Sequence, residues 1–403
     1  MRTLEPKPGQ RWVVLGIWFF ASVSGFMVLS TLGILLPAVS AELDLSPSQQ
    51  GLLVSAGYWG NLVLAIPLSL WTSRFGPKIL TTVTLVVGTF LIFAHAWAPV
   101  FGVLLAARLA FGITLLAREP ARALLIRQWF RPTEAVLANG ISNVFFGLVV
   151  GGGLLATPIL LRALEDDWRV MYQVFGGLLA LITLLWIALG RERVTQEFRK
   201  LNLPRAGLLR AAISHRDLWV GGFGFIGAVM SFSAFLSFYP TLMLETYQIS
   251  LRWSGAILGL GVLVGGIAGI AVSFALMARD RRKGLLQAFG VAMAVSYAGM
   301  TLTDSIPVLM ALSFANGIAW GFFPILYTVP FLLPGIRPRE VAVAVAFTTV
   351  MLSAGFLLGP LSTGFLQEAT GDLRLALLAV SFTSVSLSVT GVILRPLATG
   401  GER

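Results

Sequence analysis

Long apolar runs alternate with short polar segments along the whole chain. Eleven stretches carry no charged residue: Trp12–Ala41, Leu45–Ser73, Ile79–Ala107, Ala135–Leu161, Val170–Gly190, Leu218–Leu244, Trp253–Ala278, Gly284–Thr303, Ser305–Ile336, Val341–Gln367 and Leu375–Leu394. Each reaches the roughly 20 residues that a helix needs to cross about 30 Å of hydrocarbon. We expect one helix in ten of them. Ile79–Ala107 contains a turn at 95–99, so a twelfth helix is expected near Val100–Ile126.

These runs are continuously apolar, whereas the strands of a membrane β-barrel alternate apolar and polar residues. Backbone groups in lipid need internal hydrogen-bond partners, which an α-helix provides within one segment. The chain is 57% hydrophobic and 12% charged, about half the charged content of a typical soluble domain. The pattern therefore predicts an all-α membrane protein with about 12 transmembrane helices.

Arginine and lysine are distributed unevenly over the polar segments, in a chain whose formal net charge is +11. With both termini in the cytoplasm, 22 of the 29 basic residues fall in cytoplasmic segments, and Arg162, Arg169, Arg252 and Arg374 fall in external turns. Cytoplasmic loops of membrane proteins are enriched in basic residues. We therefore expect a multi-pass protein of the inner (plasma) membrane with both termini cytoplasmic. The charge indicates topology and contact with membrane lipid, and not binding to nucleic acid.

The sequence divides into two similar halves. The polar segment Arg191–Asp217 lies near the midpoint, and we expect six-helix bundles at 1–190 and 217–403 joined by a cytoplasmic linker at 191–216. Four features recur about 204–208 positions apart: Ser46-x4-Gly51 and Ser250-x4-Gly255, Arg74…Lys78 and Arg279…Lys283, Gly147-x3-Gly151 and Gly355-x3-Gly359, and Asp167-Trp168-Arg169 and Asp372-Leu373-Arg374. Such a duplication predicts two pseudo-symmetric bundles with a substrate site between them.

The residues that enzymes use are scarce. The chain has no cysteine, and its two histidines, His95 and His215, are expected in an outer turn and in the central linker. No metal-ligand spacing, paired-carboxylate site or phosphate-binding Gly-Lys-Ser/Thr loop is present. We therefore expect a protein that is no enzyme and that needs neither a metal nor another cofactor. We also expect a monomer.

Several turns resemble motifs of the major facilitator superfamily. Ser73-Arg74-Phe75-Gly76-Pro77-Lys78 is similar to the family's signature loop, Asp-Arg-x-Gly-Arg-Arg/Lys; it matches at Arg74, Gly76 and Lys78 and departs at Ser73 and Pro77. Leu104-x3-Arg108-x3-Gly112, Trp129-Phe130-Arg131 and Asp167-Trp168-Arg169 also look like family sequences. The resemblance implies the major facilitator fold, alternating access, and a central cavity lined by helices one, four, seven and ten.

Charged residues within the spans are confined to the fourth helix. Charges inside a membrane are costly, about 2.5–3.5 kcal/mol each on the insertion scale, and usually mark functional sites. Arg108 lies deep in this helix, and a guanidinium can bind a carboxylate or phosphate with two hydrogen bonds. We expect it to bind an anionic group of the substrate. The alternative is a structural anchor bonded to carbonyl groups of neighbouring helices.

Gating and coupling candidates lie nearer the cytoplasm. Arg118, Glu119 and Arg122 form a charge network at the inner gate, or they act as a second anion site or as a proton-linked switch at Glu119. The loop residues Arg74, Gly76 and Lys78 are expected to act as a conformational latch, with plain positive-inside charge as the alternative.

Polar and aromatic residues of other presumed cavity helices are further candidates. Asn316, Trp320 and Tyr327 share one helix face, and a buried amide such as Asn316 needs a partner. The other substrate-binding candidates are Trp18 of the first helix, Phe232 of the seventh and, outside the presumed cavity helices, Tyr58 of the second. For the aromatic residues, helix packing is the alternative interpretation.

Two main functions are compatible with the sequence. The fourth-helix arginines, with no carboxylate in any other span, favour a transporter for a small organic anion or related metabolite, with a proton as the candidate coupling ion. The aromatic cavity faces leave a multidrug efflux antiporter as the alternative, although Gly147-x3-Gly151-Gly152 lacks the proline of the antiporter motif. A receptor or scaffold without transport activity is a third class.

Overall fold

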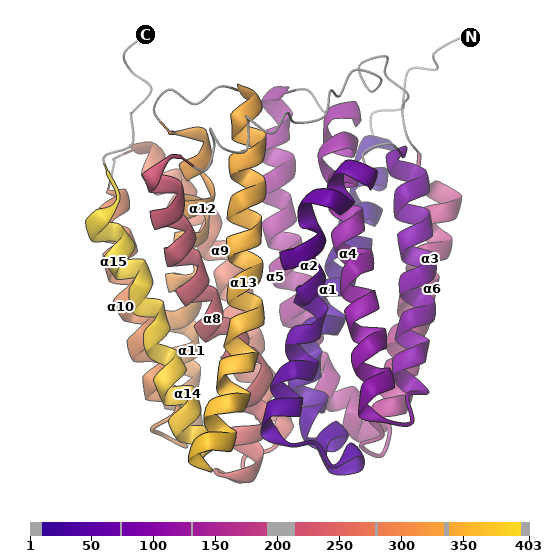
Figure 1. The fold of residues 1–403 in the computed structure, drawn as a ribbon, viewed down its shortest axis with the longest axis vertical. Helices are drawn as coiled ribbons and strands as arrows, with labels where there is room; N and C mark the ends of the chain where they lie inside the picture. Colours follow the sequence, from indigo (N-terminus) through magenta and orange to yellow (C-terminus); the bar gives the residue numbers. More distant parts are fainter. Residues whose placement is uncertain are drawn as a thin grey trace.

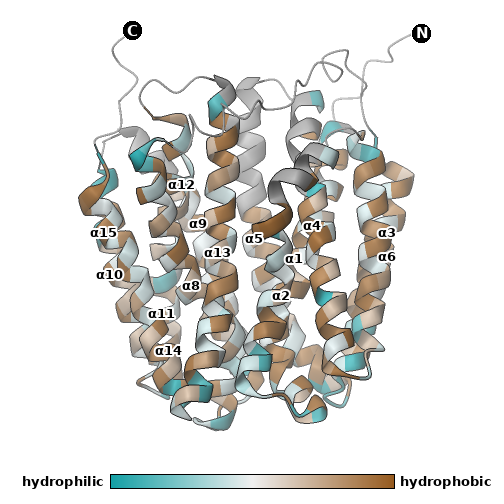
Figure 2. Ribbon diagram, viewed as in Figure 1, coloured by the Kyte–Doolittle hydropathy of each residue, from teal (hydrophilic) through white to brown (hydrophobic). Residues whose placement is uncertain are grey.

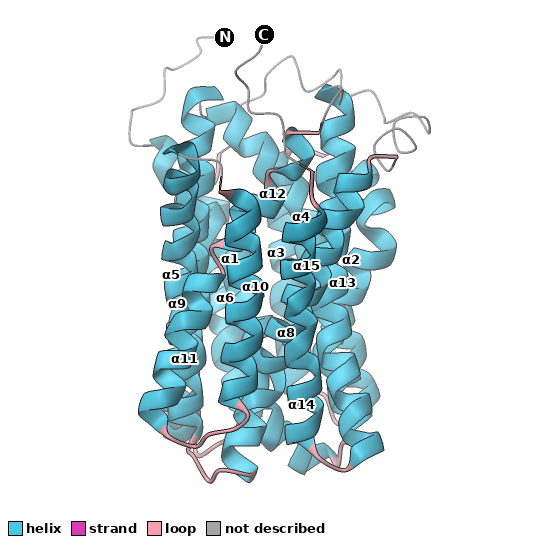
Figure 3. Ribbon diagram, turned by 90° about the vertical axis from the view of Figure 1, so that its left-hand side faces the viewer, coloured by secondary structure: helices cyan, strands magenta, loops and turns pink. Residues whose placement is uncertain are grey.

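The structure is a computed structural model that describes residues 10–72, 75–129, 132–191, 214–278, 281–333 and 338–395. Within these ranges every regular element is a helix (Figure 3). The helices run side by side, and both termini lie at one end of the bundle (Figure 1). Figure 2 shows predominantly hydrophobic ribbon along the helices, with hydrophilic residues concentrated toward their ends.

The first six spans are single helices, and the last six include two that are broken. The N-terminal half comprises α1 (Gln10–Leu43), α2 (Pro47–Thr72), α3 (Pro77–Ala96), α4 (Phe101–Trp129), α5 (Pro132–Ala163) and α6 (Trp168–Leu189). The C-terminal half comprises α8 (Arg216–Glu245), α9 (Leu251–Ala278), α10 (Arg282–Met300), α11 (Ile306–Ala319), α12 (Phe322–Tyr327), η2 (Val329–Phe331), α13 (Pro338–Thr370), α14 (Leu373–Ser381), η3 (Phe382–Ser384) and α15 (Val385–Ile393).

Among the described residues, 10 helical segments are long and apolar enough to cross a membrane. The remaining two, α2 and α10, pack between them: α2 lies against α4 and α13, and α10 against α11 and α15. The expected multi-pass all-α architecture with 12 spans is confirmed. The boundaries of the halves remain predictions, because residues 192–213 lie outside the described part.

The expectation of one continuous helix in each stretch is wrong for the tenth and twelfth spans. Helix α11 stops before Trp320 because Pro324, four residues on, has no N–H to bond the Trp320 carbonyl; the N–H of Phe323 bonds it at 3.1 Å instead. In the twelfth span η3 interrupts the helix, and the Ser231 hydroxyl of α8 lies 3.0 Å from the Val380 carbonyl. Side chains and tightened turns thus replace the lost helical bonds.

The two halves repeat each other in local geometry. Asp167 caps α6 by accepting hydrogen bonds from the backbone N–H groups two and three residues on, and Asp372 caps α14 in the same way. The following arginines also correspond: Arg169 donates to the Ala98 carbonyl beyond α3, and Arg374 donates to the Thr301 carbonyl beyond α10. These shared caps support the duplication inferred from the sequence.

Two glycine contacts are also repeated. A Cβ atom on Gly112 of α4 would collide with the Gly57 carbonyl of α2, and one on Gly317 of α11 would collide with the Gly261 carbonyl of α9. Small residues let membrane helices approach this closely. The second and fourth spans of each half therefore cross at a corresponding glycine pair.

We expect Gly112→Ala and Gly317→Ala each to destabilise the purified protein by about 1–3 kcal/mol, because the added methyl group overpacks a backbone contact. Thermal unfolding in detergent measures this. Gly152→Ala in α5 is the matched control, since nothing lies within 4 Å of its Cβ position. Equal melting temperatures for all three variants would contradict the proposed packing.

Candidate functional site

The two halves meet along three helix pairs, α1 with α8, α2 with α13, and α5 with α9. At the end opposite the termini this interface is tightly closed. The Ser48 N–H donates to Glu368 at 3.0 Å. A Cβ on Gly51 would collide with the Pro360 carbonyl, and a Cβ on Gly255 would collide with a carbonyl of α5. Backbone-to-backbone contact on both sides of the bundle closes this end.

Aromatic side chains cross the interface farther along the bundle. Phe356 of α13 stacks on Tyr58 of α2 with ring centroids 4.7 Å apart, and contacts Phe26 of α1 at 5.4 Å. On its own side Phe356 contacts Phe232 at 6.1 Å, and Phe232 contacts Trp320 at 4.5 Å. We call these five residues the aromatic wall. It joins helices of both halves.

Arg108 lies on the N-terminal side of this wall and is completely buried. Its Nη2 donates to the Leu29 carbonyl of α1 at 2.8 Å, while Nε and Nη1 have no partner in hydrogen-bond geometry. Tyr58 and Tyr172 of α6 are close enough to interact electrostatically with the guanidinium. No described carboxylate pairs with Arg108. Part of the guanidinium is thus anchored, as the structural alternative requires, and its Nε and Nη1 lie near the Tyr172 hydroxyl without a hydrogen bond of good geometry.

His95 adjoins this cluster, which corrects its expected place in an outer turn. It lies in the last turn of α3 and is fully buried. Its Nδ1 is 2.6 Å from the Leu91 carbonyl, its Nε2 has no partner, and its ring lies 5.1 Å from that of Tyr172. Sequence reasoning missed both His95 and Tyr172. The apolar run continues unbroken up to Ala94, and extending the predicted helix by one residue would have placed His95 inside it.

Arg118 connects three helices within the N-terminal half. It is buried, and it donates to the Thr84 hydroxyl of α3 at 3.2 Å and to the Ala21 carbonyl of α1 at 2.8 Å. Trp18 of α1 also reaches α3, where it donates to the Thr81 hydroxyl at 3.3 Å. In this conformation both side chains therefore donate to hydroxyl groups of α3.

The other gating candidates are only partly covered. Arg74 and the side chains of Glu119 and Arg122 lie outside the described residues. Gly76 is the N-cap of α3, and Lys78 is in its first turn, where its carbonyl accepts a bond from Trp186 at 3.4 Å. The proposed latch and switch thus remain predictions.

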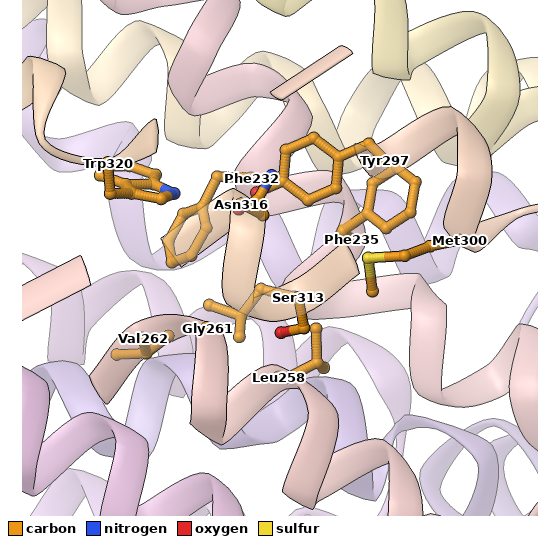
Figure 4. A pocket seen from close by; sticks show the side chains of 11 residues that line it. Phe232, Phe235, Leu258, Gly261, Val262, Tyr297, Met300, Ser313, Asn316 and Trp320 are labelled. Carbon is orange, nitrogen blue, oxygen red and sulfur yellow. The ribbon is translucent and has the colours of Figure 1, made fainter. Parts of the chain in front are cut away.

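The C-terminal half contains a small cavity between α8, α9, α10 and α11 (Figure 4). It holds about 20 Å³ of free space, enough for one water molecule or one hydroxyl group. Its lining includes the predicted residues Phe232, Asn316 and Trp320 together with Tyr297 and Ser313. Asn316 Nδ2 and Trp320 Nε1 are buried without a partner in hydrogen-bond geometry. Buried donors without a partner are uncommon in native proteins.

The structure thus brings part of the predicted set together. Tyr58, Phe232 and Trp320 belong to the aromatic wall, Asn316 lines the cavity behind it, and Arg108 lies near Tyr58.

One predicted aromatic residue lies away from the aromatic wall, and two aromatic residues near the site were not predicted. Tyr327 lies apart, in α12, where it stacks on Phe323 at 5.6 Å. Phe356 and Tyr297 were not predicted. Tyr297 carries a hydroxyl inside an otherwise apolar span, which is the signal that could have identified it.

Proteins similar to this chain over most of their length are named as transporters. The chain is 24% identical to the uncharacterized transporter YybO of Bacillus subtilis, with 91% of each protein covered. It is 23% identical to the hexuronate transporter of the same organism, covering 94% of this chain and 93% of that one. It is also 23% identical to the probable galactarate/D-glucarate transporter GarP of Escherichia coli, covering 96% and 95%.

Solved structures share the fold. A bacterial homologue of the human lysosomal transporter Spinster, in an inward-facing and unoccupied conformation, matches with a TM-score of 0.73 at 17% identity, over 96% of this chain and 95% of that one. The family model described as Major Facilitator Superfamily matches residues 18–360. Together with the 12-span helical architecture, this match shows that the chain is a membrane transporter that belongs to the major facilitator superfamily.

Proposed function

We propose that this transporter carries a small organic anion by alternating access and that Arg108 binds the anionic group. The observation that carries the proposal is the Arg108 guanidinium, which is fully buried, has two nitrogens without a partner of good hydrogen-bond geometry beside the Tyr172 hydroxyl, and forms no ion pair with a described carboxylate. A buried charge without a counter-charge is unfavourable. A carboxylate from the substrate would supply the counter-charge and accept hydrogen bonds from N–H groups along one edge of the guanidinium.

The relatives support an acid as substrate. Two of them are named for hexuronate and for galactarate or D-glucarate, which are carboxylates of similar size. We therefore infer that sugar acids and related carboxylates are the first substrates to test. Exchange, facilitated diffusion and proton coupling are all compatible with this site, and Glu119 is the candidate proton carrier within the spans.

We also propose that both termini face the cytoplasm and that this conformation is closed toward the outside. The 22 basic residues expected on the side of the termini support a cytoplasmic location of both ends in the plasma membrane. The tight closure lies at the opposite end, so the protein is closed toward the outside in this conformation. We expect it to act as a monomer, with its apolar outer surface in contact with lipid.

Arg108→Gln is expected to reduce uptake of the transported acid into liposomes by at least about tenfold, because it removes a charge-assisted bidentate contact. The melting temperature should not fall, since the substitution also removes an unneutralised buried charge. Arg252→Gln, at an exposed position, is the matched control. A thermal-shift screen of carboxylates on the purified protein identifies the acid to use.

Unchanged uptake by Arg108→Gln would exclude the proposed role of Arg108. A purified protein that is stabilised by no carboxylate, but whose overexpression raises resistance to several unrelated lipophilic drugs, would favour the multidrug alternative.

Locking the closed end should stop transport. The chain has no cysteine, so Ser48→Cys with Glu368→Cys creates a single pair across the interface. A short, reducible bis-thiol reagent should abolish uptake, and a reductant should restore it. The single-cysteine variants treated in the same way are the controls. Full activity of the cross-linked protein would show that this end need not open.

The orientation can be tested on the two ends of one helix. Arg281→Cys and Asp304→Cys flank α10, and both positions are exposed. In intact cells a membrane-impermeant maleimide should label Asp304→Cys at once and Arg281→Cys only after the membrane is disrupted. The reverse pattern would contradict cytoplasmic termini.

A further inference from the structure

The small cavity in the C-terminal half occupies the place that corresponds to Arg108 in the N-terminal half. Gly317 follows Gly112 by 205 positions, and the two glycines make equivalent contacts with the second span of their half. With the same spacing, Ser313 of α11 corresponds to Arg108 of α4. Ser313 lines the cavity. A small side chain therefore stands where the other half carries a long, charged one.

The cavity presents hydrogen-bond donors that lack an acceptor of good geometry. Asn316 is 6% exposed, and its Nδ2 has no partner. Trp320 Nε1 has none either, and the Tyr297 hydroxyl lies beside both groups. The Ser313 hydroxyl is already used, since it donates to the Ile257 carbonyl at 2.5 Å. The Tyr297 hydroxyl oxygen is thus the one acceptor beside these two donors that the described lining supplies, and a further accepting oxygen in the cavity would give them a partner of better geometry.

The charge of the surroundings limits what that acceptor can be. The segments 218–244, 253–278, 284–303, 305–336, 341–367 and 375–394 contain no charged residue. A carboxylate in this cavity would have no counter-charge, which is costly in a membrane interior. A neutral hydroxyl oxygen carries no such penalty, and one hydroxyl group fits the free space.

The cavity also borders the interface between the halves. Phe232 and Trp320 line it and at the same time belong to the aromatic wall. On the other side of Phe356 lies Tyr58, which is close enough to Arg108 to interact with it electrostatically. The cationic site and the neutral donor site thus lie on opposite sides of one wall of rings.

We propose that the C-terminal cavity is a binding site for a neutral hydroxyl group of the substrate, with Asn316 and Trp320 as its donors. The inference rests on the proposed transport of organic anions, and it adds that the protein selects hydroxylated acids. One carboxylate binds the N-terminal half, and a hydroxyl group of the carbon chain binds the C-terminal half.

The test compares D-glucarate with adipate, the six-carbon dicarboxylate that lacks the hydroxyl groups, by competition against the transported acid in liposomes. The wild-type protein should bind D-glucarate more tightly. Trp320→Phe and Asn316→Leu should each lower the affinity for D-glucarate by about tenfold, because each removes one buried donor. The affinity for adipate should stay unchanged. Trp186→Phe is the matched control, since its indole lies in the other half and bonds the Lys78 carbonyl. Asn316→Ser, which keeps a donor, should restore part of the preference.

The outcomes separate the two proposals. If D-glucarate and adipate compete equally well in the wild type, or if Trp320→Phe and Asn316→Leu weaken both acids alike, the hydroxyl site is wrong while anion transport stands. If no carboxylate is bound or transported by the folded wild-type protein, the anion transporter itself is wrong, and the hydroxyl site with it.

Discussion

The absence of water from the hydrocarbon interior is the constraint on which this structure depends. Every polar group placed there needs a partner within the protein. Helices satisfy their own backbones, and where the twelfth span is broken, Thr383 donates to the Gly227 carbonyl of α8 at 2.9 Å. Against this background, the donors of Arg108, Asn316 and Trp320 that lack a partner in hydrogen-bond geometry are among several exceptions, which also include Ser24 and Thr241. Those of Arg108, Asn316 and Trp320 lie on the two sides of a single interface.

The fold could be predicted well from the sequence, because each membrane span is marked by the composition of about 20 or more consecutive residues and not by any single residue. Runs of uncharged residues define the spans, and repeated turns indicate the duplication, as the matching caps at Asp167 and Asp372 show. The break before Trp320 was missed although its cause, Pro324, is visible in the sequence. Apolarity over a whole span does not reveal where one carbonyl loses its partner, since that depends on a single residue four positions ahead.

The site was less predictable. Arg108 could be identified because a charge in a span is rare, but its surroundings come from helices far away in sequence, such as Tyr172 of α6. No local pattern indicates that α6 packs beside a cavity helix. Trp18 carries the same local signal as Trp320, yet it bonds to Thr81 of α3. Only the crossing geometry of the helices, which glycine contacts help to set, distinguishes the two.

The duplication gives a reason why, in the proposed mechanism, the two halves bind different groups of the substrate. Alternating access moves one bundle against the other around a bound substrate. If only one half contacted the substrate, the binding contacts would not depend on the relative position of the two bundles. With a cation on one side of the aromatic wall and neutral donors on the other, a hydroxylated acid would bridge both halves. In the proposed mechanism the empty carrier buries the Arg108 charge without a counter-charge, whereas the loaded carrier buries a neutral ion pair. In the proposed mechanism, binding therefore satisfies donors in both halves at once, which stabilises the loaded protein as it passes between its two openings.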